Sequence, residues 1–292
     1  MHNGCDGSFR LNRAYVEIGN ICNLSCSFCA GTRREPRQMT EEEFRFVLTA
    51  LQPHTDYLYL HVMGEPLLHD LLGRFLEIAG ELGFRVCITT NGTLLGERGG
   101  VLLDRAETIH KVSVSLHSME GNGIEALGAY LDSVTDFASR AAERGIYTVY
   151  RLWNLDSEEG SGANGDNAAI EAHLKKLYPD EWQKRWNGYR LAERIFLEYA
   201  GVFTWPTESE AEPIDTGSCH GVLDQIAVLA DGSVVPCCLD CEGEILLGNI
   251  YATPLRDILS SERASAMREG FRSGRMVERL CKTCTYARRF GK

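Results

Sequence analysis

Residues 13–29 read RAYVEIGNICNLSCSFC, in which a strand-like segment runs directly into three cysteines. The three, Cys22, Cys26 and Cys29, follow in the spacing C-x3-C-x2-C. Three thiolates this close in sequence converge on one inorganic centre only from a loop. A cube of four irons normally takes four cysteines, so three would leave one iron with an open position. A zinc site completed by a distant histidine or cysteine is the alternative.

Strand-like and helix-like segments alternate from residue 13 to about residue 155. Thr40 and Glu43 have the spacing of a capping box, and the apolar residues after them recur at helical intervals. Further helices are predicted at 67–82 and from Ile124 to Ala138. Strands are predicted at 13–19, 56–63, 84–90, 111–116, 146–153 and 194–199. Strands separated by helices predict a parallel α/β layer or barrel.

The composition and the predicted secondary structure change twice in the rest of the chain. Residues 156–191 are polar and Gly-rich, then helical and Trp-bearing, which predicts an insertion after a strand. Residues 225–238 predict a β-hairpin with Asp231-Gly232 as its turn, followed by a helix that starts at Thr253-Pro254. We expect a domain boundary near residue 210, which gives a core of 1–210 and a second domain of 211–292.

The cysteine trio and the ends of later strands resemble the radical S-adenosylmethionine (SAM) superfamily. Phe28 stands before the third cysteine, and Met63-Gly64-Glu65-Pro66 resembles the family's GGEP-type motif, with Met63 in place of the first glycine. The segments ITTNG (88–92) and VSLHS (114–118) look like the family's third and fourth strand ends. The resemblance covers about residues 13–200 and implies a partial (β/α)6 TIM-like barrel.

What the resemblance implies is a radical enzyme. Cys22, Cys26 and Cys29 would hold a catalytic [4Fe–4S] cluster whose open iron binds SAM. Reductive cleavage of SAM would give a 5′-deoxyadenosyl radical that abstracts a substrate hydrogen, and a flavodoxin or ferredoxin would supply the low-potential electron. The residues expected to contact SAM are Phe28, Met63, Gly64, Glu65, Pro66, Asn91, Ser115, His117 and Arg151.

The C-terminal cysteines resemble a SPASM/twitch domain, the radical SAM extension that binds an auxiliary iron–sulfur cluster. Cys219, Cys237, Cys281 and Cys284 fit C-x12-G-x4-C followed by C-x2-C, with Gly232 as the glycine. The layout resembles the 2-deoxy-scyllo-inosamine dehydrogenase type. It implies one auxiliary [4Fe–4S] cluster on these four cysteines.

A zinc ribbon is the alternative for the same region. Cys238-x2-Cys241 and Cys281-x2-Cys284 would form its two knuckles. We favour Cys219 and Cys237 over Cys238 and Cys241, because the surroundings CCLD and LGN match the SPASM texture.

Composition excludes several classes of protein. The 292 residues carry 30 basic against 41 acidic side chains, which argues against broad nucleic-acid binding. No apolar run approaches the roughly 18–20 residues that span a membrane, and the N-terminus does not resemble a secretory signal. Eleven cysteines in such a chain indicate metal binding in the reducing cytoplasm rather than disulfides.

The leading hypothesis is oxidation of a small molecule or a peptide, with the auxiliary cluster as electron acceptor. Redox-neutral epimerisation would instead need a hydrogen donor such as Cys238 or Cys241, and a peptide cross-linking maturase is a further alternative. A non-catalytic zinc or iron–sulfur module is the hypothesis from a different class.

Overall fold

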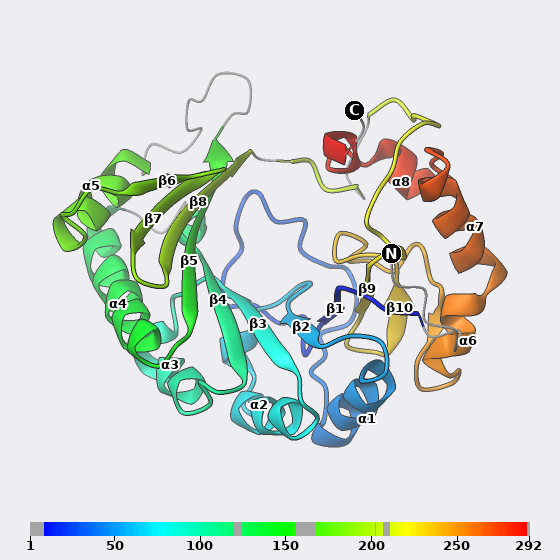
Figure 1. The fold of residues 1–292 in the computed structure, drawn as a ribbon, viewed down its shortest axis with the longest axis horizontal. Helices are drawn as coiled ribbons and strands as arrows, with labels where there is room; N and C mark the ends of the chain where they lie inside the picture. The colour runs from blue at the N-terminus through cyan, green and yellow to red at the C-terminus, as the bar shows by residue number, and fades with distance from the viewer. Residues whose placement is uncertain (1–8, 120–123, 156–166, 202, 207–210, 291–292) are drawn as a thin grey trace.

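The computed structural model describes residues 9–119, 124–155, 167–201, 203–206 and 211–290. Its centre is a curved sheet of six parallel strands that lie side by side in chain order (Figure 1). They are β1 (Arg13–Val16), β2 (Tyr57–Leu60), β3 (Arg85–Thr90), β4 (Ile109–Ser115), β5 (Tyr147–Leu155) and β8 (Ile195–Gly201). The predicted partial barrel is confirmed: the sheet curves but does not close on itself within the described residues.

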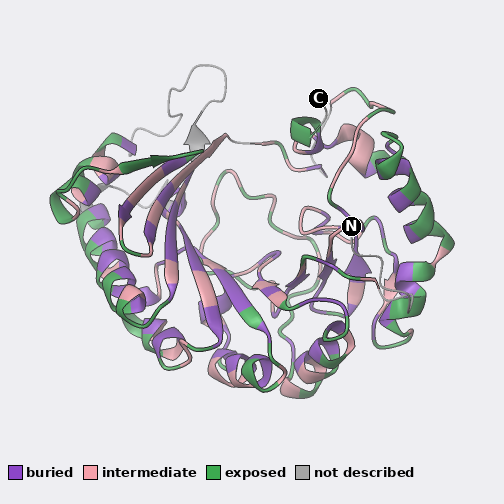
Figure 2. Cartoon of the chain, viewed as in Figure 1, coloured by how far each residue is buried: buried purple, intermediate pink, exposed green. Residues whose placement is uncertain are grey.

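The helices that connect these strands cover the outer face of the sheet (Figure 1). They are α1 (Glu41–Leu51), α2 (Leu72–Glu81), α3 (Leu95–Leu103) and α4 (Ile124–Glu143). At the start of α1 the Thr40 hydroxyl accepts the Glu43 N–H and the Glu43 carboxylate accepts the Thr40 N–H, as the capping box predicted. Phe44 and Phe75 stack at 4.2 Å between α1 and α2. The core therefore lies between the sheet and its outer helices (Figure 2).

Two predicted segments differ from the structure. Residues 66–68 form a short 3-10 helix, η1 (Pro66–Leu68), and α2 begins only at Leu72. The helical structure predicted for the later part of the insertion at 156–191 is wrong from residue 183 on. After α5 (Asn167–Leu177), this segment forms β6 (Gln183–Arg185) and β7 (Gly188–Ala192), which extend the sheet antiparallel beyond β8. The Gly-rich residues 156–166 lie outside the described residues.

The C-terminal segment continues the same sheet on its other side. Strand β9 (Gln225–Val228) pairs parallel to β1, and β10 (Ser233–Val235) and β11 (Gly248–Asn249) follow antiparallel. The hairpin predicted at 225–238 is confirmed, and Gly232 has φ +84° at its turn. The chain then forms α6 (Leu255–Ser260), α7 (Glu262–Arg272), α8 (Arg279–Thr283) and η4 (Ala287–Phe290). The domain boundary near 210 stays a prediction.

The helices that the structure describes include none long and apolar enough to cross a membrane.

Candidate active site

The three N-terminal cysteines lie on the loop that joins β1 to α1, as the sequence predicted. Cys22 and Cys29 are exposed and Cys26 is half-buried. The N–H of Leu24 points at the Cys22 sulfur and the N–H of Gly31 at the Cys29 sulfur, each at 3.4 Å. N–H donors of this kind stabilise sulfur ligands of iron–sulfur clusters. The loop therefore exposes Cys22 and Cys29, with a backbone N–H directed at the sulfur of each, while the Cys26 sulfur lies 4.0 Å from the Ser118 carbonyl oxygen.

The Met63–Pro66 segment crosses directly beneath this loop. Gly64 has φ +79°, and a Cβ atom placed on it would lie 2.4 Å from the Gly19 carbonyl oxygen. The Glu65 N–H donates to the Ile21 carbonyl at 2.9 Å. Pro66 is buried where η1 begins. Only glycine permits this close approach, because it has no side chain and reaches a positive φ freely.

The Glu65 side chain is buried and faces the protein. It accepts hydrogen bonds from the Leu67 N–H at 3.0 Å, the Thr90 hydroxyl at 2.7 Å and the Asn91 N–H at 2.7 Å. Burial raises the pKa of Glu65, and the three donors oppose that rise. The carboxylate thus ties the end of β2 to the end of β3, and its direct contact with SAM stays a prediction.

Asn91, at the end of β3, reaches back to the cysteine loop. Its side-chain amide donates to Asn23 at 2.9 Å and lies 3.9 Å from the Cys22 sulfur. The Tyr130 hydroxyl of α4 donates to the Asn91 carbonyl at 2.7 Å. Asn91 is therefore held beside the first of the three thiols.

The ends of β4 and β5 meet the cysteine loop through two rings. Phe28 packs on His117 of η2 (Leu116–Met119) with the ring centroids 4.7 Å apart. The His117 Nδ1 lies 3.1 Å from the Arg151 carbonyl oxygen, and burial lowers the pKa of His117 to about 4. Ser115, the last residue of β4, pairs with Arg151 of β5. The structure thus brings Phe28, His117 and Arg151 together on one side of the loop.

The four C-terminal cysteines favoured from the sequence line one cavity of about 320 Å³. They are Cys219, Cys237, Cys281 and Cys284. Burial raises the pKa of each, and repulsion from Cys238, then from Cys219 and Cys281, raises that of Cys237 further. Thiols in such surroundings ionise only when a cation holds the charge. Four buried thiols that line one cavity fit an iron–sulfur cluster, and His220 and Asp240 line the same cavity.

The cysteines of the alternative knuckle lie differently. Cys238 lines the same cavity on its barrel side, where burial raises its pKa to about 11 against a hydrogen bond to Tyr15. Cys241 is fully buried, and burial followed by the Glu242 carboxylate raises its pKa to about 12. Within the described residues, no three His, Cys, Asp or Glu side chains stand close enough to share one metal ion. The choice between the two cysteine sets stays a prediction.

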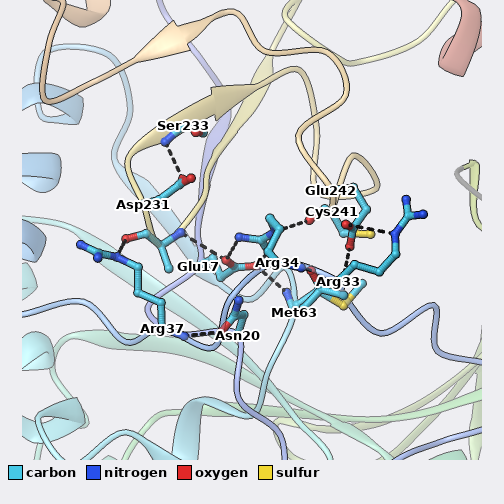
Figure 3. Close-up of polar contacts among 12 residues, drawn as sticks. Glu17, Asn20, Arg33, Arg34, Arg37, Met63, Asp231, Ser233, Cys241 and Glu242 are labelled. Atoms are coloured by element: carbon cyan, nitrogen blue, oxygen red, sulfur yellow. Dashed lines mark hydrogen bonds and ion pairs between the residues drawn. The ribbon is translucent and has the colours of Figure 1, made fainter.

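The structure adds residues that the sequence did not point to. Tyr15 and His61 line the cavity on the barrel side, and their rings lie 5.0 Å apart. The Trp205 indole N–H donates to the Phe28 carbonyl at 2.9 Å, so this tryptophan anchors the cysteine loop. Glu17 is fully buried at the end of β1 and forms an ion pair with Arg34 (Figure 3). No signal in the sequence marked these partners, because they are distant along the chain.

Comparison with known families agrees with this geometry. The radical SAM superfamily matches residues 16–159, and SPASM, an iron–sulfur cluster-binding domain, matches residues 219–285. The chain belongs to the radical SAM superfamily. Its SAM-binding [4Fe–4S] cluster and auxiliary iron–sulfur cluster are the cofactors of these two domains.

Individual relatives of this radical SAM protein cover the chain to different extents. An S-adenosyl-L-methionine-dependent 2-deoxy-scyllo-inosamine dehydrogenase from Niallia circulans is 24% identical over 92% of this chain and 90% of its own length. A probable GTP 3′,8-cyclase from Pyrobaculum aerophilum is 29% identical, but over only 38% of this chain and 36% of its own length. The crystal structure of BtrN in complex with AdoMet and 2-DOIA has a TM-score of 0.57 at 19% identity, covering 95% of this chain and 94% of that one. This last likeness shows the shared fold.

Proposed function

We propose that this radical SAM protein dehydrogenates a small polar substrate, with the auxiliary cluster as electron acceptor. The observation that carries the proposal is the shared cavity. Cys219, Cys237, Cys281 and Cys284 line it together with the barrel residues Arg13, Tyr15, His61 and Arg151. A substrate radical formed in the barrel would therefore lie next to the proposed ligands of the auxiliary cluster.

The two sets of cysteines hold different groups in this proposal. Cys22, Cys26 and Cys29 hold the cluster that binds SAM, and the four C-terminal cysteines hold the auxiliary cluster. When bound, the first group supplies a 5′-deoxyadenosyl radical for hydrogen abstraction, and the second supplies an acceptor for the electron that substrate oxidation releases. An alcohol carbon that loses one hydrogen atom, then one proton and one electron, becomes a carbonyl. The electron that leaves balances the electron used to cleave SAM.

The barrel residues of the cavity favour a substrate rich in hydroxyl or carboxylate oxygens. Arg13 and Arg151 supply cationic donors. Burial and the neighbouring cations Arg151, Lys111 and Arg13 lower the pKa of His61 to about 3, so the imidazole is neutral at physiological pH. The Niallia circulans relative carries the name of an inosamine dehydrogenase. The hydroxyl groups of such a ring suit the two guanidinium donors, and we therefore propose a small hydroxylated ring as the first substrate to test.

Redox-neutral epimerisation is the second candidate, and it rests on Cys238. This thiol lines the same cavity as the barrel residues and remains protonated at neutral pH, because its pKa is raised to about 11. A protonated thiol facing a substrate radical could donate a hydrogen atom. Cys241 is fully buried beside Arg34 and Glu242, so we do not assign it this role.

The partners and location follow from the chemistry. A flavodoxin or ferredoxin is the proposed source of the electron, since SAM cleavage needs a low-potential donor. We propose a cytoplasmic location, because the ten cysteines that the structure describes are all free thiols.

The test uses the anaerobically reconstituted protein with SAM, dithionite and 2-deoxy-scyllo-inosamine in D2O. Dehydrogenation predicts one 5′-deoxyadenosine for each product molecule, and a product with two hydrogen atoms fewer. The Cys281→Ala/Cys284→Ala variant should still cleave SAM but lose the oxidised product. A product that instead gains one solvent deuterium, and fails to do so in Cys238→Ala, would replace dehydrogenation with epimerisation.

A further inference from the structure

The fully buried carboxylate of Glu17 joins three parts of the molecule that are distant in sequence. It accepts two hydrogen bonds from the Arg34 guanidinium, at 2.8 and 2.7 Å. It also accepts the Met63 N–H and the Ala230 N–H, each at 3.2 Å. The cysteine loop, the SAM motif and the C-terminal hairpin therefore meet on one side chain (Figure 3). Bidentate pairing of an arginine with a carboxylate fixes the relative orientation of the two groups as well as their distance.

Arg34 carries this connection into the C-terminal domain. Its Nε donates to the Cys241 carbonyl at 2.8 Å, and its side chain is only 16% exposed. The preceding residue makes a parallel link, because the Arg33 N–H donates to the Glu242 side chain at 3.1 Å. The loop that carries the three N-terminal thiols is thus fastened directly to residues 241–242.

Residues 237–245 form a tight turn with one proposed cluster ligand at its start. The Asp240 N–H lies 3.3 Å from the Cys237 carbonyl. The fully buried Asp240 carboxylate accepts the Glu244 and Ile245 N–H groups, each at 2.9 Å. The position of Cys237 and that of the Cys241 carbonyl are therefore set by the same short, internally hydrogen-bonded segment.

We propose that the Glu17–Arg34 pair is a positioning element that couples the two cluster sites. Loading the C-terminal site fixes Cys237, and with it the turn whose Cys241 carbonyl holds Arg34. Arg34 in turn sets the Glu17 carboxylate, which orients the Met63 N–H at the SAM motif. This inference rests on the proposed assignment of the auxiliary cluster to Cys219, Cys237, Cys281 and Cys284. Coupling of this kind is reciprocal, so each site favours the loaded state of the other.

The test measures SAM binding with the C-terminal site intact and with it removed. Cys281→Ala/Cys284→Ala is made in the wild-type background and in the Arg34→Gln background. Each is compared with its own parent protein, and iron is counted in every sample. Equilibrium dialysis gives the dissociation constant of SAM, and electron paramagnetic resonance records how SAM alters the signal of the reduced N-terminal cluster. Losing the C-terminal site should weaken SAM binding about fivefold or more in the wild-type background. In the Arg34→Gln background the same change should have less than about a twofold effect.

Two further variants separate coupling from folding. Arg74→Gln removes an arginine whose Nε donates to Glu41 at 2.9 Å on the outer helices. In this background, Cys281→Ala/Cys284→Ala should weaken SAM binding by the same factor as in wild type. Arg34→Lys keeps the charge but loses the bidentate hydrogen bonds to Glu17 and the hydrogen bond to the Cys241 carbonyl. In this background too, loss of the C-terminal site should weaken SAM binding less than in wild type, which provides a test if Arg34→Gln fails to fold.

The outcomes distinguish this inference from the proposed function. If Cys281→Ala/Cys284→Ala loses the expected iron but weakens SAM binding equally in the wild-type and Arg34 backgrounds, the coupling is wrong. The cluster assignment would then be unaffected. If Cys281→Ala/Cys284→Ala loses no iron, the cluster assignment itself is wrong, and the coupling falls with it.

Discussion

The side chain of Glu65 accepts a hydrogen bond from the backbone N–H of Asn91, with 2.7 Å between the two atoms. This contact joins the SAM motif after β2 to the end of β3, where Asn91 itself reaches the cysteine loop. The position of Asn91 beside Cys22 therefore depends on a carboxylate that faces the protein interior.

Replacing Glu65 with Gln should destabilise the protein. The amide keeps one acceptor oxygen but turns a donor toward groups that are themselves donors, so at least one buried partner is left unsatisfied. We expect the free energy of unfolding to fall by about 2–4 kcal/mol in urea titrations. Glu41→Gln, in a half-exposed pair with Arg74, should cost less than about 1 kcal/mol. Equal losses in the two variants would contradict this role for Glu65.

Gly64 and Gly31 provide a matched pair, because both have a positive φ, +79° and +62° respectively. A Cβ on Gly64 would meet the Gly19 carbonyl at 2.4 Å, whereas a Cβ on Gly31 meets nothing within 4 Å. Both alanine variants place a side chain at a positive φ, and only Gly64→Ala adds a clash with a backbone oxygen. Gly64→Ala should be less stable than Gly31→Ala by about 1–3 kcal/mol, and SAM binding should weaken only in Gly64→Ala. Thermal unfolding and dialysis check both, and indistinguishable variants would refute the packing argument.

His117 predicts a specific pH dependence of stability. Burial lowers its pKa to about 4 in the folded protein, against about 6.5 in the unfolded chain. Below the unfolded pKa of about 6.5, the unfolded chain binds a proton that the folded protein does not. The free energy of unfolding is therefore highest above this pH and decreases as the pH falls toward the folded pKa of about 4. From about pH 7.5 to about pH 5, wild type should lose about 2 kcal/mol more than His117→Gln. Parallel pH curves for the two proteins would show that the buried imidazole does not titrate in this way.

Cys238 and Cys241 test the choice between the two C-terminal ligand sets. Cys241 is fully buried beside Arg34 and Glu242, whereas Cys238 lines the cavity beside Tyr15. The Cys238→Ala/Cys241→Ala variant should keep nearly all its iron after anaerobic reconstitution. A loss of about four irons would move the cluster onto this pair.

Local signals predicted the elements that border the site. The Thr40–Glu43 capping box gave the start of α1, and the Asp231-Gly232 turn gave the β9–β10 hairpin. The strand ends at Asn91 and Ser115, and the strand that carries Arg151, could be predicted because strand and helix patterns alternate clearly in this part of the chain.

The strands β6 and β7 were missed for a physical reason. β6 is three exposed polar residues at a sheet edge, so no apolar alternation marks it. The one usable signal was Asn187-Gly188, a turn pair beside the tip of this hairpin. A Cβ on Gly188 would lie 1.9 Å from the Leu197 carbonyl, which explains the glycine there.

The Glu17–Arg34 pair could not be predicted from the sequence. Glu17 reads as one polar residue in an apolar strand, and its other partner Ala230 lies more than two hundred positions away. That contact exists because β9 pairs parallel to β1, with Val16 opposite Val228. Sequence periodicity assigns residues to faces, but it does not reveal which distant strand becomes the neighbour.

The most direct test of the two cluster sites is a metal count with an activity readout. Iron, sulfide and zinc are measured in anaerobically reconstituted wild type and in Cys22→Ala/Cys26→Ala/Cys29→Ala, with 5′-deoxyadenosine assayed after SAM and dithionite. We predict about eight irons in wild type, and about four irons with no 5′-deoxyadenosine in the variant. About four irons and one zinc in wild type, with SAM cleavage intact, would contradict the auxiliary cluster and its role as electron acceptor.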